Sequence, residues 1–240
     1  MIWLIILILL ILLLKIKEMH LHIDWKSFLR KGFKKLDNKF GIFCYTGKQG
    51  TGKTYSAIRF TLQEQAKEKY LVLTNIKSFH NSCPNSKYYT NIQEIIEFCE
   101  KEFKKPEERR QKVLIFFDEI FTCLEKGGAL KKEILSFLSQ LRKRKIIFVT
   151  TAQEWSEIQI TFRRYVRYQI SCNMIALPFT KEALVINNIN DGDLIRWDND
   201  QQDFVAPLIQ KNIHKGNLTI INKYDTFETI NISQGLNKVR

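Results

Sequence analysis

From residue 40 onward, short runs of β-branched and aromatic residues alternate with longer stretches whose apolar residues recur at helical spacing. The expected strands cover residues 40–46, 70–76, 113–119 and 145–153, and the expected helices cover residues 54–67, 91–103 and 130–143. The run VLIFFDE (113–119) is almost continuously apolar, as expected for a strand that is buried on both faces of a parallel sheet. This alternation predicts an α/β fold with a mainly parallel sheet that is flanked by helices.

The pattern changes after residue 168, where short strand-like runs are separated by Asn, Asp and Gly. These runs are YQISCNMI (168–175), ALVINNI (183–189) and NLTIINKY (217–224). We therefore expect a core domain over residues 40–180 and a small β-rich C-terminal extension over residues 181–240.

Residues 1–14 are apolar without a break, so a helix formed by them would be apolar on every face. Such a helix would be about 21 Å long at about 1.5 Å per residue, which is short of the roughly 30 Å hydrocarbon core of a bilayer. Snorkelling of Lys15 and Lys17 narrows this gap. The segment has no positive residues before it and no small-residue cleavage site, which argues against a signal peptide. We expect a transmembrane anchor over residues 1–16.

The basic segment that follows, over residues 17–39, sets the expected orientation of this anchor. Lysine and arginine accumulate on the cytoplasmic side of membrane spans. The N-terminus is therefore expected outside, and the rest of the chain in the cytoplasm. The segment can also lie on anionic head groups or contact DNA.

The composition indicates the kind of partner and the kinds of cysteine site that we do not expect. The 240-residue chain has a formal net charge of +13, which indicates an anionic partner, either nucleic acid or a phospholipid surface. Codon bias toward lysine is the alternative cause. The 5 cysteines are widely spaced and include no CxxC pair, so we expect neither a disulfide framework nor a zinc site.

Residues 47–54 (GKQGTGKT) match the pattern G-x4-G-K-[ST] and lie between an expected strand and an expected helix. The glycines allow backbone N–H groups to surround the β-phosphate of a nucleotide, and the helix N-terminus adds its dipole. Lys53 is expected to neutralise the β- and γ-phosphates, and the Thr54 hydroxyl to ligate Mg²⁺. The expected nucleotide-binding residues are Gly47, Gln49, Gly50, Thr51, Gly52, Lys53 and Thr54.

Two adjacent carboxylates, Asp118 and Glu119, end the third expected strand. Asp118 is expected to reach the Mg²⁺ shell, directly or through water, and Glu119 to polarise the attacking water as a general base. Guanine recognition of the GTPase type requires an N-K-x-D motif after a strand, which the chain lacks. The expected cofactors are therefore ATP and Mg²⁺.

Polar side chains follow the next strand at Thr150, Thr151 and Gln153. A polar group at this position can sense the γ-phosphate or hold the lytic water, and Gln153 is the favoured residue. The alternative is that the two threonines are β-branched strand residues before a helix cap.

Arginines at positions 163, 164 and 167 come next. One of the three is expected to act as an arginine finger on the γ-phosphate of a neighbouring subunit, with Arg163 and Arg164 as the favoured candidates. This predicts a homo-oligomer in the form of a ring. A solvated basic face is the alternative. The basic cluster at residues 141–145 either contacts a DNA backbone or is a solvated surface.

These pieces together resemble the zonula occludens toxin (Zot) family of filamentous-phage assembly ATPases, and more broadly the FtsK/HerA-type DNA-pumping ATPases. The matching segments are TGKQGTGKT (46–54), LTN (73–75), FFDE (116–119), IIFVTTAQ (146–153), FRRYVRY (162–168) and Tyr224-Asp225-Thr226. The resemblance implies a bacteriophage protein of the host inner membrane. Zot-type proteins typically carry their membrane span after the ATPase domain, whereas the expected span here is N-terminal.

The expectation is thus a membrane-anchored P-loop ATPase that drives phage assembly and extrusion of DNA, with single-stranded DNA favoured. Its implied partners are further copies of itself, the host inner membrane, phage DNA and other phage assembly or coat proteins. A DNA-packaging or conjugation-type translocase is the first alternative. A nucleotide-binding adaptor without turnover is the second, and the complete set Lys53, Thr54, Asp118 and Glu119 argues against it.

Overall fold

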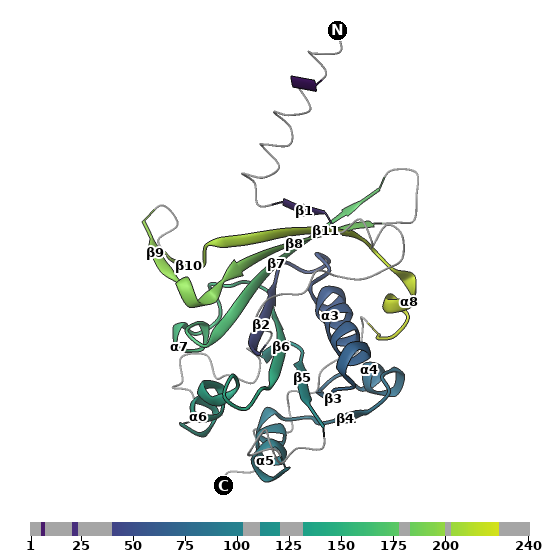
Figure 1. Cartoon of the computed structure of the whole chain (residues 1–240), viewed down its shortest axis with the longest axis vertical. Coiled ribbons are helices and arrows are strands. Elements are labelled where there is room, and N and C mark those ends of the chain that lie inside the picture. Colours follow the sequence, from purple (N-terminus) through teal and green to yellow (C-terminus); the bar gives the residue numbers. More distant parts are fainter. Residues whose placement is uncertain are drawn as a thin grey trace.

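The computed structural model describes residues 6–7, 21–23, 40–102, 111–120, 132–177, 183–199 and 203–225. In this part of the chain, nine strands form one sheet in the order β1-β11-β8-β7-β2-β6-β5-β3-β4 (Figure 1). The strands from β7 to β4 in this order are all parallel. They are β2 (Gly41–Thr46), β3 (Leu71–Thr74), β4 (Ser86–Tyr88), β5 (Val113–Phe117), β6 (Ile147–Ala152) and β7 (Val166–Ala176). The predicted mainly parallel α/β sheet is confirmed.

The C-terminal part of the chain continues this sheet. Strands β8 (Ala183–Asp191) and β11 (Leu208–Lys215) join it antiparallel next to β7, and β1 (Leu21–Ile23) pairs parallel with β11. Between β8 and β11 the chain forms a short 3-10 helix (Gly192–Leu194) and a separate hairpin of β9 (Arg196–Asp198) and β10 (Asp203–Val205). The predicted C-terminal extension therefore shares a sheet with the predicted core.

The strand expected over residues 217–224 is wrong, because this segment contains the short helix α8 (Leu218–Ile221). The Oδ1 atom of Asn217 accepts a hydrogen bond of 2.9 Å from the Thr219 N–H. A side chain that bonds the backbone two residues ahead favours a helix start over a strand.

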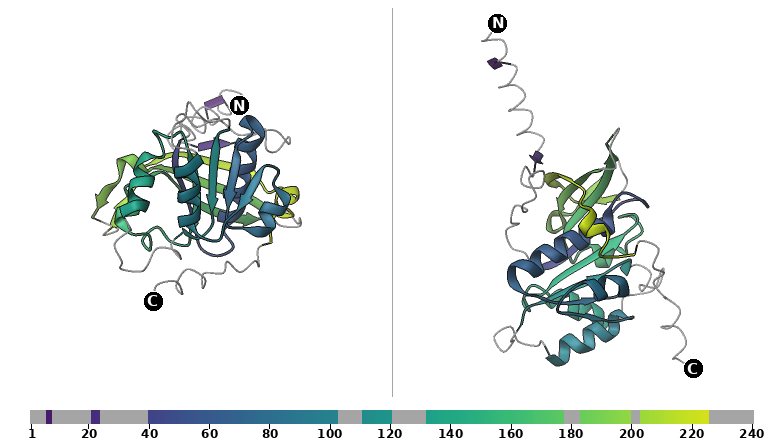
Figure 2. Two further views of the ribbon diagram at one scale, coloured as in Figure 1. Left: turned by 90° about the horizontal axis from the view of Figure 1, so that it is seen from below. Right: turned by 90° about the vertical axis from the view of Figure 1, so that its right-hand side faces the viewer.

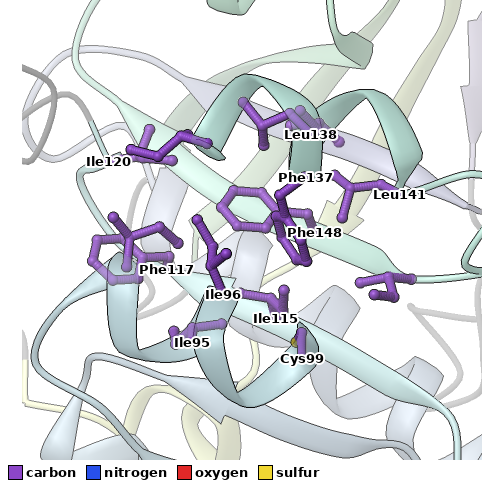
Figure 3. Packing of buried hydrophobic residues seen from close by; sticks show 14 of the residues in the cluster. Ile95, Ile96, Cys99, Ile115, Phe117, Ile120, Phe137, Leu138, Leu141 and Phe148 are labelled. Atoms are coloured by element: carbon purple, nitrogen blue, oxygen red, sulfur yellow. The ribbon is translucent and has the colours of Figure 1, made fainter. Parts of the chain in front are cut away.

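Helices cover both faces of the sheet (Figures 1 and 2). One face carries α3 (Lys53–Glu68), α4 (Lys77–Ser82) and α8, and the other carries α5 (Ile92–Glu102), α6 (Lys132–Gln140) and α7 (Ile160–Arg163). The central strands are buried on both faces, and their side chains alternate between two hydrophobic clusters. Figure 3 shows the face that carries α5, α6 and α7, where Phe137 and Leu138 of α6, Ile96 of α5 and Phe148 of β6 belong to one hydrophobic cluster.

The register of the parallel strands separates two edges of the sheet. At the carboxyl edge, Thr46 at the end of β2 pairs with Ala152 at the end of β6. At the amino edge, Ile42 near the start of β2 pairs with Val166 at the start of β7. Helix α7 ends just before Val166, so its last residue lies toward the amino edge. The loop that follows β2 lies at the opposite, carboxyl edge.

Among the described residues, no helix is long and apolar enough to cross a bilayer. The anchor predicted over residues 1–16 lies outside them except for residues 6 and 7. The basic segment predicted over residues 17–39 lies outside them except for residues 21–23.

Candidate nucleotide-binding site

The glycine loop connects the end of β2 to the start of α3. Its backbone requires glycine at two positions in particular. Gly52 has a φ of 80°, in the left-handed region, and a Cβ there would also lie 2.6 Å from Met174 Cε. A Cβ at Gly47 would lie 2.9 Å from the carbonyl oxygen of Cys172 and would also clash with the Thr51 hydroxyl. The loop is therefore a tight backbone turn that lies against β7.

Backbone hydrogen bonds hold the loop in this shape. The Gly47 N–H donates to the carbonyl of Gln153 at 3.1 Å, which ties the loop to the end of β6. The Thr51 hydroxyl donates to the carbonyl of Lys48 at 2.7 Å. Gln49 and Gly50, at the tip of the loop, are exposed. The tip is thus accessible to a ligand, while both ends of the loop are fixed.

Helix α3 begins immediately after the loop, at Lys53. In the part of the chain that the structure describes, no side chain caps this helix at Gly52. The first N–H groups of a helix lack partners within the helix and attract anions. The Lys53 side chain is 9% exposed, so its charge lies in a largely desolvated position beside these N–H groups. This combination suits a phosphate group.

The strands added at the C-terminal end support the start of α3. The Ser56 hydroxyl donates to Oδ1 of Asn187 on β8 at 3.1 Å, and both residues are buried. The Tyr55 hydroxyl accepts a hydrogen bond of 2.9 Å from the backbone N–H of Asn217, which follows β11. The glycine loop and its helix are therefore held by parts of the chain that lie more than 100 residues away in sequence.

Thr54 and Asp118 bring two oxygen atoms together in front of the loop. The Thr54 hydroxyl donates to Oδ1 of Asp118 at 3.5 Å. Hydroxyl and carboxylate oxygens are ligands that Mg²⁺ prefers, usually together with phosphate oxygens and water. The donor set therefore fits Mg²⁺ bound with a nucleotide.

Burial raises the pKa of Asp118 to about 6, and the Glu119 carboxylate acts in the same direction. The hydrogen bond from Thr151, the charge of Lys53 and the hydrogen bond from Thr54 oppose this shift. A bound dication adds positive charge beside the carboxylate and would favour its ionised form.

Glu119 follows Asp118 in an unusual backbone conformation. Its φ of 52° lies in the left-handed region, which is uncommon for residues other than glycine. Its N–H donates to the Thr151 hydroxyl at 2.9 Å, and the next residue, Ile120, is buried in the hydrophobic core. The hydrogen bond to Thr151 and the burial of Ile120 thus hold Glu119 in this conformation. Strained residues of this kind concentrate at functional sites.

The two threonines at the end of β6 have different roles because they point to opposite faces of the sheet. Thr151 donates its hydroxyl proton to Oδ1 of Asp118 and accepts the Glu119 N–H. The hydroxyl of Thr150 is buried and has no hydrogen-bond partner among the described residues. Gln153 is exposed, and its carbonyl bonds the glycine loop. Thr151 is therefore the polar residue of this strand that contacts the carboxylates.

Asn75 contacts the same turn, although the sequence pattern assigns it no role. Its Nδ2 donates to the carbonyl of Asp118 at 3.0 Å, and its Oδ1 accepts the Asp118 N–H at 2.8 Å. One sequence feature could have identified Asn75. It is a polar residue directly after the buried strand β3, and β3 pairs with β5, the strand that leads to Asp118.

Arg163 is bonded within its own chain. Its Nε donates to the carbonyl of Ile158 at 2.7 Å, its Nη2 to the carbonyl of Ser156 at 2.5 Å, and its Nη1 to Asp203 at 2.8 Å. The side chain is only 7% exposed. These contacts give Arg163 a structural role that joins α7 to the β9–β10 hairpin.

Arg164 and Arg167 lie beside it, away from the glycine loop of the same chain. Arg164 is exposed, and Arg167 forms an ion pair with Asp193 and lies over the ring of Tyr168. Both lie toward the amino edge of the sheet. The six residues of β2 separate this edge from the loop, a distance of about 20 Å at about 3.3 Å per residue.

Residues Tyr224 and Asp225 lie over α3 and α4. The Asp225 N–H donates to the Ser78 hydroxyl at 3.0 Å, and Tyr224 packs against the core on that face. Burial raises the pKa of Tyr224 to about 12, and the charge of Asp118 contributes to this shift. The described end of the chain therefore approaches the candidate site, while Thr226 lies outside the described residues.

Comparisons with known proteins agree with the α/β fold. The family model described as Zonular occludens toxin (Zot) matches residues 41–181. The crystal structure of the N-terminal domain of zonular occludens toxin from Neisseria meningitidis is similar, with 16% identity and a TM-score of 0.50, covering 77% of this chain and 98% of that one.

The genome packaging NTPase B204 from Sulfolobus turreted icosahedral virus 2, in complex with ATP-gammaS, has 10% identity and a TM-score of 0.46, covering 76% of this chain and 100% of that one. No curated protein matches.

Proposed function

Because this chain belongs to the zonular occludens toxin family, we propose that it is a Mg²⁺-dependent P-loop ATPase that serves the assembly of a bacteriophage. The observation that carries the ATPase assignment is the convergence of Thr54 and Thr151 on the Asp118 carboxylate, next to the buried Lys53. Two strands, β5 and β6, and the start of helix α3 contribute to this arrangement, which a structural ion pair does not need.

Each residue has a defined task in hydrolysis of ATP. The loop N–H groups and Lys53 bind the phosphates and hold the nucleotide in place. Thr54 and Asp118 would hold Mg²⁺, and the bound ion would supply positive charge to neutralise the phosphates. Glu119 accepts a proton from the attacking water as general base. Thr151 fixes the carboxylate pair relative to β6.

We place the ATPase at the host inner membrane, where it drives extrusion of phage DNA, single-stranded DNA in the favoured case. The apolar residues 1–14 support the anchor, and the formal net charge of +13 supports an anionic cargo. A translocase that moves duplex DNA into a capsid is the alternative within the same chemistry.

The active unit in this proposal is a homo-oligomeric ring. No described arginine of the FRRYVRY segment lies at the glycine loop of its own chain, so a finger from this segment has to act on a neighbouring subunit. Arg164 takes this role in place of Arg163, because Arg164 is exposed whereas the guanidinium of Arg163 is bonded internally. An arginine finger contributes roughly 10³–10⁵ in rate in enzymes that depend on one.

Hydrolysis of ATP by the full-length chain in detergent tests the proposal. We expect Mg²⁺-dependent release of phosphate that is stimulated by single-stranded DNA. Lys53→Ala should abolish ATP binding and turnover, whereas Lys67→Ala, at the exposed end of the same helix, should leave both unchanged. Stronger stimulation by duplex DNA would favour the packaging translocase. ATP binding without any turnover would favour the adaptor and contradict the proposal.

Mixed oligomers test the trans finger. Arg164→Ala subunits and Lys53→Ala subunits should each be inactive alone. Mixtures should regain part of the activity, because some interfaces pair an intact loop with an intact arginine. Inactive mixtures of variants that still assemble would contradict this role.

A further inference from the structure

The side chain of Asn75 continues a strand pairing beyond the point where the backbones stop pairing. The ladder between β3 and β5 ends with the pair Thr74 and Phe116. One residue further on, the Asn75 carboxamide bonds both the N–H and the carbonyl of Asp118, at 2.8 Å and 3.0 Å. Asn75 is 3% exposed, so these bonds form in a desolvated position, where they are hard to replace by water.

The turn that carries the two carboxylates is consequently held from both neighbouring strands. Asn75 fixes the Asp118 peptide from the side of β3, and Thr151 fixes the Glu119 N–H from the side of β6. The left-handed φ of Glu119 costs free energy and persists only if its surroundings enforce it.

Asn75 itself is well anchored. The residue before it, Thr74, is buried and accepts the N–H of Ile76 through its hydroxyl at 3.2 Å. Ile76 is buried in the core beside α3. Asn75 thus lies in a short, buried connection between the end of β3 and the start of α4, which fixes its backbone.

From this geometry we propose that Asn75 is a positioning residue for hydrolysis: it holds the backbone of Asp118, and thereby sets the Mg²⁺-binding carboxylate and the general base Glu119 relative to the nucleotide. This proposal rests on the proposed ATPase function. Among the described residues, the Asn75 side chain bonds the backbone of Asp118 and not its carboxylate, so it acts through Asp118 and Glu119. Misplacement of reacting groups by about 1 Å can cost about 100-fold in rate.

The test compares Asn75→Leu with Asn91→Leu in the full-length chain. Leucine has the same number of side-chain heavy atoms as asparagine but lacks both hydrogen-bonding groups. Asn91 is the matched control, because its Oδ1 also accepts a backbone N–H, from Gln93 at 2.9 Å, but at the start of α5. Both variants should lower the melting temperature. Only Asn75→Leu should lower kcat, by about 10- to 100-fold, with the Kd for ATP within about two-fold of wild type.

Asn75→Ser serves as a milder variant if the leucine variant does not fold, and it should lower kcat in the same direction. The proposal is overturned if the Asn75 variants keep the kcat of Asn91→Leu, or if they lose ATP affinity and stability without any separate loss of kcat. Wild-type turnover is measured in the same series. An inactive wild type would overturn the proposed function and this proposal together, whereas an active wild type with unaffected Asn75 variants would overturn this proposal alone.

Discussion

Thr151, at the end of β6, donates its hydroxyl proton to the carboxylate of Asp118, which follows β5. The same hydroxyl accepts the N–H of Glu119 at 2.9 Å. The Thr151 side chain therefore orients the carboxylate of Asp118 and also fixes the backbone of Glu119. Its neighbour Thr150 makes no such contact within the described residues, which provides an internal control.

Replacing these threonines by valine should separate the two roles. Thr151→Val should lower kcat for ATP by about 10-fold or more, because an unrestrained carboxylate pair loses its alignment. Thr150→Val should leave kcat unchanged and should keep or raise the free energy of unfolding by up to about 1 kcal/mol, because it removes a buried, unbonded hydroxyl. Steady-state kinetics and urea unfolding of both variants measure this, and equal effects of the two changes on kcat would contradict the assignment.

Substitution of Arg163 should lower the free energy of unfolding, whereas substitution of Arg164 should leave it nearly unchanged. Arg163→Met should lower the free energy of unfolding by about 2–4 kcal/mol, because it breaks a largely buried ion pair and two hydrogen bonds to backbone carbonyls. Arg164→Ala should change it by less than about 0.5 kcal/mol, as expected for an exposed residue. Urea unfolding compares them, and a stable Arg163→Met chain would speak against the structural role.

The four cysteines that the structure describes should resist alkylation in the folded chain. Cys44, Cys83, Cys99 and Cys172 are all buried. Burial raises the pKa of Cys172 to about 12 and that of Cys83 to about 11, and only the thiolate form reacts. Iodoacetamide at pH 8 should modify these positions only after unfolding, as mass spectrometry of peptides can measure. Rapid modification of Cys172 in the native chain would contradict the described packing of β7.

The sequence predicted the parallel strands and the glycine loop because each depends on a short, continuous stretch of residues. The apolar run before Asp118 requires burial on both faces, and residues 47–54 allow few other backbone shapes. The position of the C-terminal strands was not predictable in this way. Pairing of β8 with β7 and β11 depends on hydrogen bonds between distant segments. Residues 218–221 form a short helix, whose start is favoured by the local bond of Asn217.

In the candidate site, too, local patterns predicted some residues, whereas tertiary packing determined others. The structure brings Lys53, Thr54 and Asp118 together at the ends of a strand and a helix. At the end of β6, Thr151 contacts Asp118, whereas the favoured residue Gln153 is exposed. The internal bonds of Arg163 to Asp203, Ser156 and Ile158 were not predictable, because tertiary packing sets these partners. Asn75 was assigned no role because it bonds the backbone of Asp118, and the motifs identify only side chains that can act on a nucleotide.

The most direct test of the ATPase assignment is ATP binding and hydrolysis by Glu119→Gln in the full-length chain with Mg²⁺. Glutamine keeps the size of the side chain but cannot accept the proton of the attacking water. Glu157→Gln, at an exposed position after β6, is the control and should behave as wild type. The account predicts that Glu119→Gln binds ATP within about three-fold of wild type and hydrolyses it at least about 100-fold more slowly. Hydrolysis by Glu119→Gln at the wild-type rate would contradict it.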